Sequence, residues 1–327
     1  MWTRFVSLTE YFNYYSRIDK KMKLIHLVLI LPRILLFFSP GEFQALMRLY
    51  RLNRFPTEPT FILDLDLPMI NVLIVVEQKD FELLPLTLGQ LLKNSLNKVS
   101  KVSVVTPFSQ MAECEELLNP FRKKMMITVY SEDDVVSSEV REKIRNEFSE
   151  RYGWVLQQFL TVAFIQSEKY SGSEPILALD ADTCLTRPTA FINCNNKQIL
   201  FTSTEYHQPY YDLIKKLSND LCEEKLSFIG HHMVYQPNLF RKIFNRLDIE
   251  SMEKLINFVL ENYQKNTLSP ICVEFEIYAQ WMVKNYRENV EILKFTNKSV
   301  ERESFLADPD FGKYSNYESI SLHSYFI

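Results

Sequence analysis

Residues 70–77 read Ile-Asn-Val-Leu-Ile-Val-Val-Glu, an almost continuous apolar run rich in β-branched side chains. Such a run is typical of a strand buried on both faces in a parallel sheet. Short apolar segments and segments of helical character alternate after it. Further strands are predicted at 102–106, 126–130, 176–179 and 198–202, with helices at 83–95, 110–118, 138–150 and 154–170. This alternation predicts right-handed βαβ units around a mostly parallel central sheet flanked by helices.

The rest of the chain is predicted to be mainly helical, apart from a strand that includes Met233 and a strand-like stretch at Ile320–Tyr325. Helices are expected near 209–225, 237–245, 251–264 and 273–286, and Gly153 is expected to break the helix at 138–150. Residues 1 to about 55 also have a helical pattern, which two prolines then end. The sequence therefore predicts an α/β domain over residues 61–327, with a helical N-terminal extension over residues 1–60.

The composition excludes several classes of protein. The chain has 327 residues, 46% of them hydrophobic and 24% charged, which is ordinary for a folded protein. Only six residues are glycine, and neither GxGxxG nor GxxxxGK[ST] occurs, so no glycine-rich phosphate loop is expected. The five cysteines are scattered without a CxxC pair. This argues against a disulfide framework or structural zinc and predicts a reducing compartment, the cytoplasm.

Basic residues gather near the start of the chain and outnumber acidic ones in residues 1–60. The apolar run at 24–38 is short and interrupted by a proline and an arginine, so we expect it to be buried or interfacial. Arg48, Arg51 and Arg54 recur at a helical spacing. They fit either peripheral contact with the inner face of a membrane or the solvated face of a packed helix. The basic content is too small to indicate a nucleic-acid partner.

The predicted strand at 176–179 runs directly into Asp180-Ala181-Asp182-Thr183. Open α/β sheets bind ligands just beyond the carboxyl ends of their strands. Two carboxylates separated by one residue can both reach a hard divalent cation, which completes its shell with water and substrate phosphates. Such a cation neutralises the charge on a departing nucleoside diphosphate. The alternative is a pair of aspartates that cap a turn, with Thr183 hydrogen-bonding locally.

A wider pattern surrounds this acidic pair. It consists of Trp154-Val155-Leu156-Gln157-Gln158, then Asp180–Thr183 with Arg187-Pro188, then Glu274-Phe275-Glu276-Ile277-Tyr278, and finally Leu322-His323-Ser324. The pattern resembles a bacterial family of GT-A-type glycosyltransferases found with polysaccharide genes. The resemblance covers roughly residues 70–327. One departure is Thr161, since a lysine is expected near that position.

The resemblance implies a GT-A-like, Rossmann-like fold and a metal-dependent glycosyltransferase. The enzyme would move a sugar from a nucleotide-sugar donor, above all a UDP-sugar, to a hydroxyl of a glycan or glycolipid acceptor. It implies Mn²⁺ or Mg²⁺ as the cofactor and a role in surface polysaccharide synthesis. Neither a particular sugar nor the stereochemical outcome follows from it.

GT-A geometry also implies roles on the donor side of the site. Val76 and Glu77 would lie beside the nucleobase and ribose, and Lys79 would make a polar contact with the donor. For Glu77 and Lys79 the alternative is a solvated loop. Gln157 and Gln158 are neighbours on one helix, so only one of them can point into the site. That amide would fix the donor sugar or the diphosphate.

The remaining roles concern the metal and the reaction. Asp180 and Asp182 would hold the cation, with Asp180 also facing the donor, and His323 would be a third ligand. Glu274 and Glu276 are candidates for the general base, which must reach the acceptor hydroxyl. They point to different faces of their helix, and Glu274 is preferred because it lies at the helix start. Both could instead serve only to complement the helix dipole.

Two further features leave alternatives open. In His231-His232, strand alternation would bury one imidazole and turn the other toward the acceptor. The motif Asp180–Thr183 also fits a phosphatase of the haloacid-dehalogenase type, with Thr202 as its second threonine. That signature normally opens its domain, whereas at least three βα units precede it here, and Asp308 and Asp310 do not follow an apolar strand. A non-catalytic carbohydrate-binding protein is the other alternative.

Overall fold

The computed structural model describes residues 47–48, 51–57, 67–203, 205–218, 226–265, 267 and 271–324. The chain divides into two compact units, Met1–Arg51 and Leu52–Ile327. The larger unit contains nearly all of the described residues and every predicted site residue. Of the predicted N-terminal extension, residues 47–48 and 51–52 are helical. The apolar run at 24–38 lies outside the described residues.

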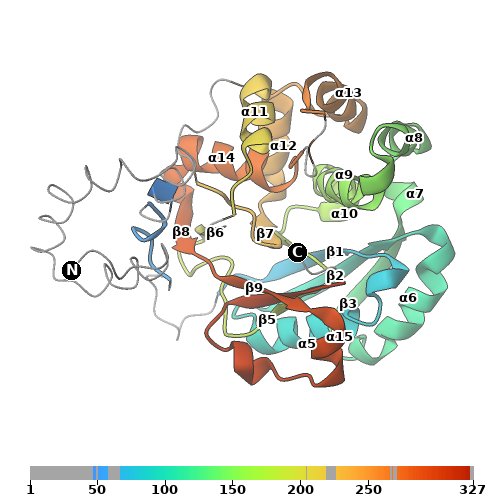
Figure 1. The fold of residues 1–327 in the computed structure, drawn as a ribbon, viewed down its shortest axis with the longest axis vertical. Helices are drawn as coiled ribbons and strands as arrows, with labels where there is room; N and C mark the ends of the chain where they lie inside the picture. Colours follow the sequence, from blue (N-terminus) through green and yellow to red (C-terminus); the bar gives the residue numbers. More distant parts are fainter. Residues whose placement is uncertain are drawn as a thin grey trace, which may run out of the picture. The chain divides into compact units, whose positions relative to one another are not determined.

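The core of the larger unit is a five-stranded sheet with the order β3-β2-β1-β4-β7 (Figure 1). Its strands are β1 (Ile70–Val75), β2 (Val99–Thr106), β3 (Met126–Ser131), β4 (Ile176–Leu179) and β7 (His232–Tyr235). The first four strands are parallel, and β7 is antiparallel to β4. The predicted α/β class with a mostly parallel central sheet is therefore confirmed.

Strand β1 is apolar at every position except Asn71 because both faces of the sheet are covered. Ile70, Val72 and Ile74 pack into one hydrophobic cluster, which includes residues of helix α5 (Leu84–Asn94). Leu73 packs into a second cluster, which includes most of the buried apolar side chains of helix α9 (Tyr152–Gln166). Figure 1 shows α9 and α10 on one side of the sheet and α5 on the other.

Most of the other helices lie in or near predicted ranges, but the short helices at 132–135 and 302–307 were not predicted. They are α6 (Met111–Leu118), α7 (Glu132–Val135), α8 (Ser138–Glu147), α10 (Glu168–Ser171), α11 (Gln208–Leu217), α12 (Pro237–Arg246), α13 (Met252–Asn262), α14 (Phe275–Asn285) and α15 (Arg302–Ala307). Short 3-10 turns join several of them, among them η1 (Gln78–Asp80) and η4 (Ser149–Arg151).

The second half contains more strands than expected, although the strand at Met233 and the strand-like stretch at Ile320–Tyr325 were predicted. Strand β7 joins the central sheet, and two smaller sheets have the orders β5-β10-β9 and β6-β8. Their strands are β5 (Thr183–Leu185), β6 (Gln198–Thr202), β8 (Val290–Lys294), β9 (Asn297–Glu301) and β10 (Ser319–His323). A strand such as β9, which reads Asn-Lys-Ser-Val-Glu, has no apolar run, so it depends on pairing with β10.

The expectation that Gly153 breaks a helix was wrong. Helix α8 ends at Glu147, and Gly153 lies in the first turn of α9. A Cβ at this position would lie 2.8 Å from Oε1 of Glu77. The absence of a side chain at Gly153 thus lets the Glu77 carboxylate approach the start of α9. The predicted helix at 154–170 is also interrupted, at the extended residue Ser167.

The apolar helices and the cysteines bear on the expected compartment. Within the described part of the chain, no helix combines the length and apolarity needed to cross a bilayer. Cys114, Cys184, Cys194 and Cys272 are free thiols, and Cys222 lies outside the described residues. The arginines proposed for peripheral membrane contact belong to a segment that the structure describes only in part.

Helix α9 carries residues of the candidate site, and its stability depends on burial. Phe159 is fully buried in this helix. We expect Phe159→Ala to lower the free energy of unfolding by about 3–5 kcal/mol, because it removes apolar contacts and leaves a cavity. Urea denaturation measures the change, with Glu174→Ala at an exposed position as the control. Equal stability of the two variants would contradict the central place of α9 in the core.

Candidate functional site

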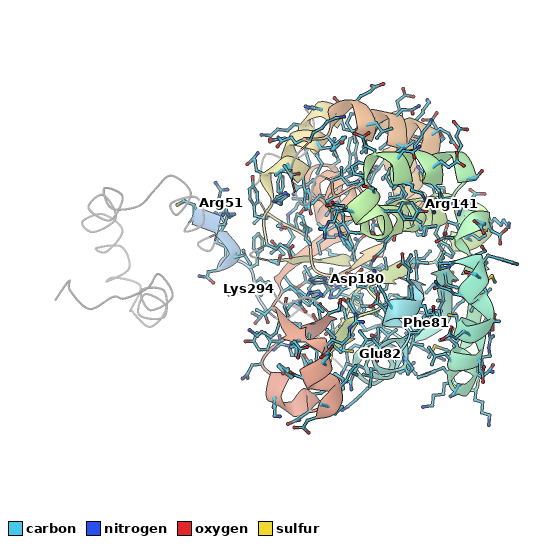
Figure 2. All side chains as sticks on the ribbon, turned by 45° about the vertical axis from the view of Figure 1, so that its right-hand side comes forward. Arg51, Phe81, Glu82, Arg141, Asp180 and Lys294 are labelled. Carbon is cyan, nitrogen blue, oxygen red and sulfur yellow. The ribbon has the colours of Figure 1, made fainter. Side chains whose placement is uncertain are left out.

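The candidate site lies where the strand order reverses. Strands β1 and β4 are parallel neighbours, but β1 leads to β2 on its other side, so the chain turns in opposite directions beyond their carboxyl ends. Such a switch point leaves a crevice for ligands in open α/β sheets. Glu77 follows β1 and Asp180 follows β4. Figure 2 labels Asp180 near the middle of the larger unit in that view.

Asp180 is paired with His231. The antiparallel register of β4 and β7 places Leu179 opposite His232, and the Asp180 amide donates to the His231 carbonyl at 3.0 Å. His231 has a φ of 59°, which is uncommon for a residue with a side chain. Its Nδ1 lies 3.1 Å from Oδ2 of Asp180. Both side chains remain partly exposed, at 22% for His231 and 23% for Asp180.

His232 takes the opposite direction. It is buried and its ring meets the rings of Phe191, Phe201 and Phe295 edge-on. Neither ring nitrogen has a hydrogen-bond partner among the described residues. Burial lowers the pKa of His232 to about 3, so the ring is neutral. Of the two histidines that the sequence left open, His231 is therefore the one at the site.

Asp182 is paired with His323 in the same way. The Leu322 amide donates to the Asp182 carbonyl at 2.9 Å, which aligns the end of β10 with the acidic motif. Nδ1 of His323 lies 3.3 Å from Oδ2 of Asp182. The rings of His231 and His323 have centroids 5.7 Å apart. The structure thus brings together two carboxylates and two imidazoles from three separate segments of the chain.

The charges of this cluster compensate one another. Burial lowers the pKa of His231, but the hydrogen bond and negative charge of Asp180 outweigh this effect and raise it to about 9. Burial raises the pKa of Asp182, but the hydrogen bond with His323 and the nearby positive charges lower it overall. His231 is therefore a cation and Asp182 an anion at neutral pH.

Helix α9 holds Asp180 from its other side. Nε2 of Gln157 donates to Oδ1 of Asp180 at 2.8 Å. Gln158 points away, and its Oε1 accepts from the Val273 amide at 3.0 Å. Thr161, which stands where the resemblance implies a lysine, is buried and donates to the Gln157 carbonyl at 3.0 Å. Gln157 therefore faces the site, and Gln158 fixes the segment that leads to Glu274.

Glu274 lies just before α14, with 6% of its surface exposed. Burial raises its pKa to about 8, the negative charge of Asp180 adds to the rise, and a hydrogen bond with Thr161 opposes it. The Tyr235 hydroxyl donates to the Glu274 carbonyl at 3.1 Å, which ties this segment to β7. Glu274 is thus a carboxyl group close enough to Asp180 for the two negative charges to repel each other.

Glu276 has a different environment. It is fully buried, and its carboxylate accepts hydrogen bonds from four groups: the Phe228 amide at 2.8 Å, Nε2 of Gln280 at 2.9 Å, and the Tyr211 and Ser227 hydroxyls at 3.2 Å each. These bonds connect α14 to the segment that precedes His231. The geometry therefore favours Glu274 over Glu276 as a group that acts on a ligand.

The residues expected on the donor side lie at the end of β1. The Val76 side chain is buried in the cluster with α5, so it can offer a ligand only its backbone. Glu77 and Lys79 form an ion pair with Oε2 and Nζ 3.6 Å apart, and both side chains are well exposed. Glu77 also lies over Gly153, as described above. Glu77 and Lys79 are therefore open to a ligand in the crevice.

The donor atoms fit a divalent cation by their chemistry, since imidazole and carboxylate together suit borderline ions such as Mn²⁺. In the described part of the chain, however, no three His, Cys, Asp or Glu side chains converge as ligands of one metal ion. Instead, Asp180 is paired with His231, and Asp182 is paired with His323. A bound cation would have to replace these hydrogen bonds.

The extra residues that a phosphatase would need are not at the site. Thr202 is buried in β6, outside the central sheet, and its hydroxyl donates to the Ser227 carbonyl at 2.9 Å. Asp308 and Asp310 are exposed, and both lie near Nζ of Lys313. The phosphatase alternative therefore lacks its supporting groups.

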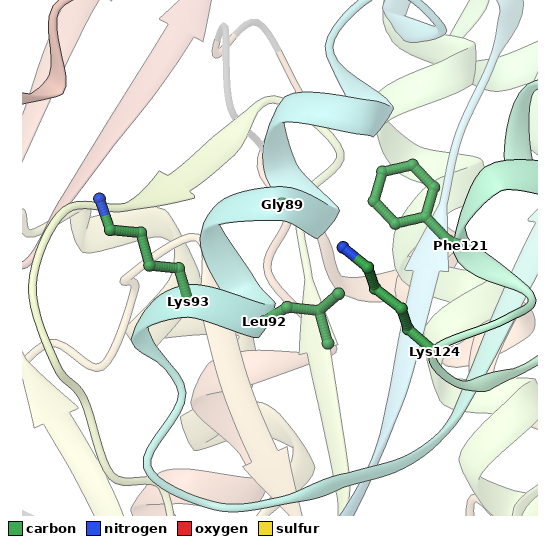
Figure 3. A pocket seen from close by; sticks show the side chains of 5 residues that line it. All are labelled: Gly89, Leu92, Lys93, Phe121 and Lys124. Atoms are coloured by element: carbon green, nitrogen blue, oxygen red, sulfur yellow. The ribbon is translucent and has the colours of Figure 1, made fainter.

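A hollow of about 440 Å³ lies elsewhere, beside the outer face of α5 (Figure 3). It is lined by Gly89, Leu92, Lys93, Phe121 and Lys124. None of the predicted site residues lines it, so it is not the candidate site.

No protein-family model matches the sequence, and no curated protein matches it. Mouse xyloside xylosyltransferase 1 is similar in structure with a TM-score of 0.43 and 12% identity, over 78% of this chain and 98% of that one. The galactosyltransferase LgtC has a TM-score of 0.42 and 10% identity, over 77% and 87%. The mannosyltransferase Ktr4p from S. cerevisiae has 0.44 and 13%, over 67% and 70%. Similarities at this level carry no inference about activity.

Glu274 makes stability depend on pH. Its pKa is about 8 in the folded protein against an ordinary value of 4.5, so between these values the folded state binds the proton more tightly. The Glu274 carboxyl therefore stabilises the fold at low pH. As pH rises from 4.5 to about 8, the free energy of unfolding should fall by up to about 1.4 kcal/mol per pH unit because of this group. Glu274→Gln, which is neutral at every pH, should remove this part of the decline.

Urea denaturation of the metal-free protein at several pH values measures the effect. The exposed Glu174→Gln serves as the control and should keep the wild-type profile. Identical profiles for the wild type and Glu274→Gln would show that the Glu274 carboxyl is not held in its protonated form.

Proposed function

We propose that this chain is a metal-dependent glycosyltransferase of the GT-A type, which moves a sugar from a nucleoside diphosphate donor to a hydroxyl of a glycan or glycolipid. The observation that carries the proposal is the grouping of Asp180, Asp182, His231 and His323 at the switch point of the sheet. Carboxylates at this place suit a cation that in turn binds a diphosphate.

The proposed metal site consists of Asp180, Asp182 and His323. When bound, Mn²⁺ or Mg²⁺ would neutralise the negative charge that develops on the departing diphosphate. The protein's part is to hold the carboxylates in place. Gln157 orients Asp180 through its amide, and the Leu322 peptide keeps Asp182 next to β10. Two imidazoles close to the carboxylates favour Mn²⁺ over Mg²⁺, which prefers oxygen ligands.

The proposed donor subsite runs from Asp180 to Glu77. The exposed Glu77 carboxylate can accept hydrogen bonds from a base N–H or from ribose hydroxyls. Uracil offers such an N–H on its pairing edge, which agrees with a UDP-sugar as the donor. Lys79 adds a positive charge for the phosphates at the same loop.

We propose Glu274 as the group that removes the proton from the acceptor hydroxyl. A base must be ionised and within reach of the proton it takes. With a pKa of about 8, the Glu274 carboxyl holds its proton in the free protein at neutral pH. A positive charge at Asp180 would favour its ionised form, so we expect the base to become available when the site is loaded. Glu276 is proposed as the residue that positions the segment before His231.

The cellular role follows from the sequence resemblance and the cysteine pattern. We propose an enzyme of surface polysaccharide synthesis that acts in the cytoplasm, where thiols stay reduced. Peripheral contact with the inner face of the membrane through residues 1–60 remains part of the proposal.

The decisive test is binding of metal and nucleotide. The melting temperature should rise when MnCl₂ is added together with UDP, and less with either alone, because the diphosphate and the cation bind as one unit. A panel with GDP and ADP identifies the base. Absence of stabilisation by any nucleotide would favour a carbohydrate-binding protein, and hydrolysis of p-nitrophenyl phosphate with Mg²⁺ would favour the phosphatase.

Asp182→Asn should abolish transfer and the joint effect of MnCl₂ and UDP while the fold is retained, because the amide keeps the shape but loses the charge. Circular dichroism checks the fold, and calorimetric titration measures the loss of binding. Asp308→Asn, at an exposed position, is the matched control. Full transfer activity of Asp182→Asn would contradict the metal role of Asp182.

Gly153→Ala tests the donor subsite. The added methyl group would displace the Glu77 carboxylate, which is the flexible end of a side chain, so the stability should change little. UDP affinity should fall because Glu77 would leave its place beside the nucleoside. Gly89→Ala, at a helical glycine with free space around it, is the control. Unchanged UDP binding by Gly153→Ala would count against Glu77 as a donor contact.

A further inference from the structure

Arg302 is a buried cation at the edge of the candidate site that the proposed reaction does not use. It is the first residue of α15, directly after β9, and only 10% of its side chain is exposed. A guanidinium group is rarely buried unless its N–H groups are bonded. Here the Nε and both terminal nitrogens have partners, and these partners belong to two segments far apart in the sequence.

The first segment is the loop after β1. Nη1 of Arg302 donates to the Lys79 carbonyl at 2.7 Å, and Nη2 forms an ion pair with the Asp80 carboxylate. Asp80 is itself mostly buried, with 17% of its side chain exposed. The same short loop carries Glu77, the proposed contact with the nucleoside.

The second segment is the end of β10. Nε of Arg302 donates to the Leu322 carbonyl at 3.2 Å. The amide of Leu322 donates to the Asp182 carbonyl at 2.9 Å, so this residue is held from both sides. His323 follows immediately and contacts Asp182. One side chain therefore connects the nucleoside end of the proposed site to its diphosphate end.

Apolar contacts also join these two regions, since Leu83 packs in one cluster with Ile320 and Leu322, but Arg302 adds directional polar bonds to the loop itself. Strand β10 is paired with β5 and β9, and the loop after β1 follows a strand paired with β2 and β4. These ladders belong to two different sheets. The charge of Arg302 also acts on both ends, since it opposes the rise in the pKa of Asp80 and helps to lower the pKa of Asp182.

We propose that Arg302 is a positioning residue that fixes the loop Glu77–Asp80 against the end of β10, and so sets the distance between the nucleoside and diphosphate subsites. This inference rests on the proposed function. A nucleoside diphosphate must satisfy both subsites at once. When two subsites are held at the right spacing, occupying one raises the effective concentration of the ligand at the other.

The test compares a ligand that spans both subsites with ligands that fill only one. Calorimetric titration in saturating MnCl₂ measures the Kd values of UDP, of uridine and of inorganic pyrophosphate. The product of the two partial Kd values divided by the Kd of UDP gives the effective concentration. If the wild type prefers GDP or ADP, that nucleotide and its nucleoside are used instead.

Arg302→Met should lower this effective concentration at least about tenfold, while uridine and pyrophosphate bind nearly as in the wild type. Arg302→Lys should give an intermediate value, because it keeps the charge but cannot bond both segments with a planar fork. Arg187→Met is the control. Arg187 pairs with Glu318, just before β10. The Arg187→Met variant therefore loosens the same small sheet without changing a contact of the loop after β1.

The possible outcomes separate the two proposals. If Arg302→Met weakens uridine, pyrophosphate and UDP in parallel, or if Arg187→Met has the same effect on the effective concentration, the positioning role is overturned. Melting temperatures of all variants show whether lost stability explains the change. If the wild type binds none of UDP, GDP and ADP, the proposed function itself fails and this inference falls with it.

Discussion

The antiparallel pairing of β7 with β4 is the contact on which the candidate site depends. It sets His232 opposite Leu179 and thereby places His231, 51 residues later in the chain, against the first carboxylate of the acidic motif. The left-handed backbone of His231 is the local cost of turning its imidazole toward Asp180 rather than into the core. The same strand holds the Glu274 segment through the Tyr235 hydroxyl. One short strand therefore positions groups from three parts of the site.

Charge compensation explains how so many ionisable groups share a small region. Each aspartate of the motif has an imidazole next to it, and Asp80 has Arg302. An unpaired buried carboxylate would be costly, whereas these pairs allow the carboxylates to stay close together before any ligand arrives. The arrangement has a consequence for binding. A cation bound at the proposed metal site would compete with the histidines for the carboxylates, so its binding would be linked to the release of these hydrogen bonds.

Helix α9 shows why some predictions were possible and others were not. From sequence, the adjacent Gln157 and Gln158 could be assigned to different faces, because neighbouring residues on a helix diverge by a fixed angle. Which of them reaches Asp180 depended on how α9 lies on the sheet. Thr161 stands where the resemblance implies a lysine, and in the fold it forms hydrogen bonds with the Gln157 carbonyl and with Glu274. In the sequence, Glu276 and Glu274 are both glutamates near a helix start and both were candidates for the base. Only the fold shows that Glu276 accepts four hydrogen bonds from buried groups and so has a structural role.

By itself the sequence determined the parallel core, since the run at 70–77 and its successors are apolar enough to be buried on both faces whatever surrounds them. It also determined the acidic pair at a strand end, which is a local feature. The tertiary structure decided the rest. Strands β7, β9 and β10 are short or polar and depend on their partners. Alternation could place His231 and His232 on opposite faces, but the groups that His231, His323 and Arg302 contact depended on how the strands pair. Local patterns encode what is buried, but the contacts between distant segments arise only when the sheets assemble.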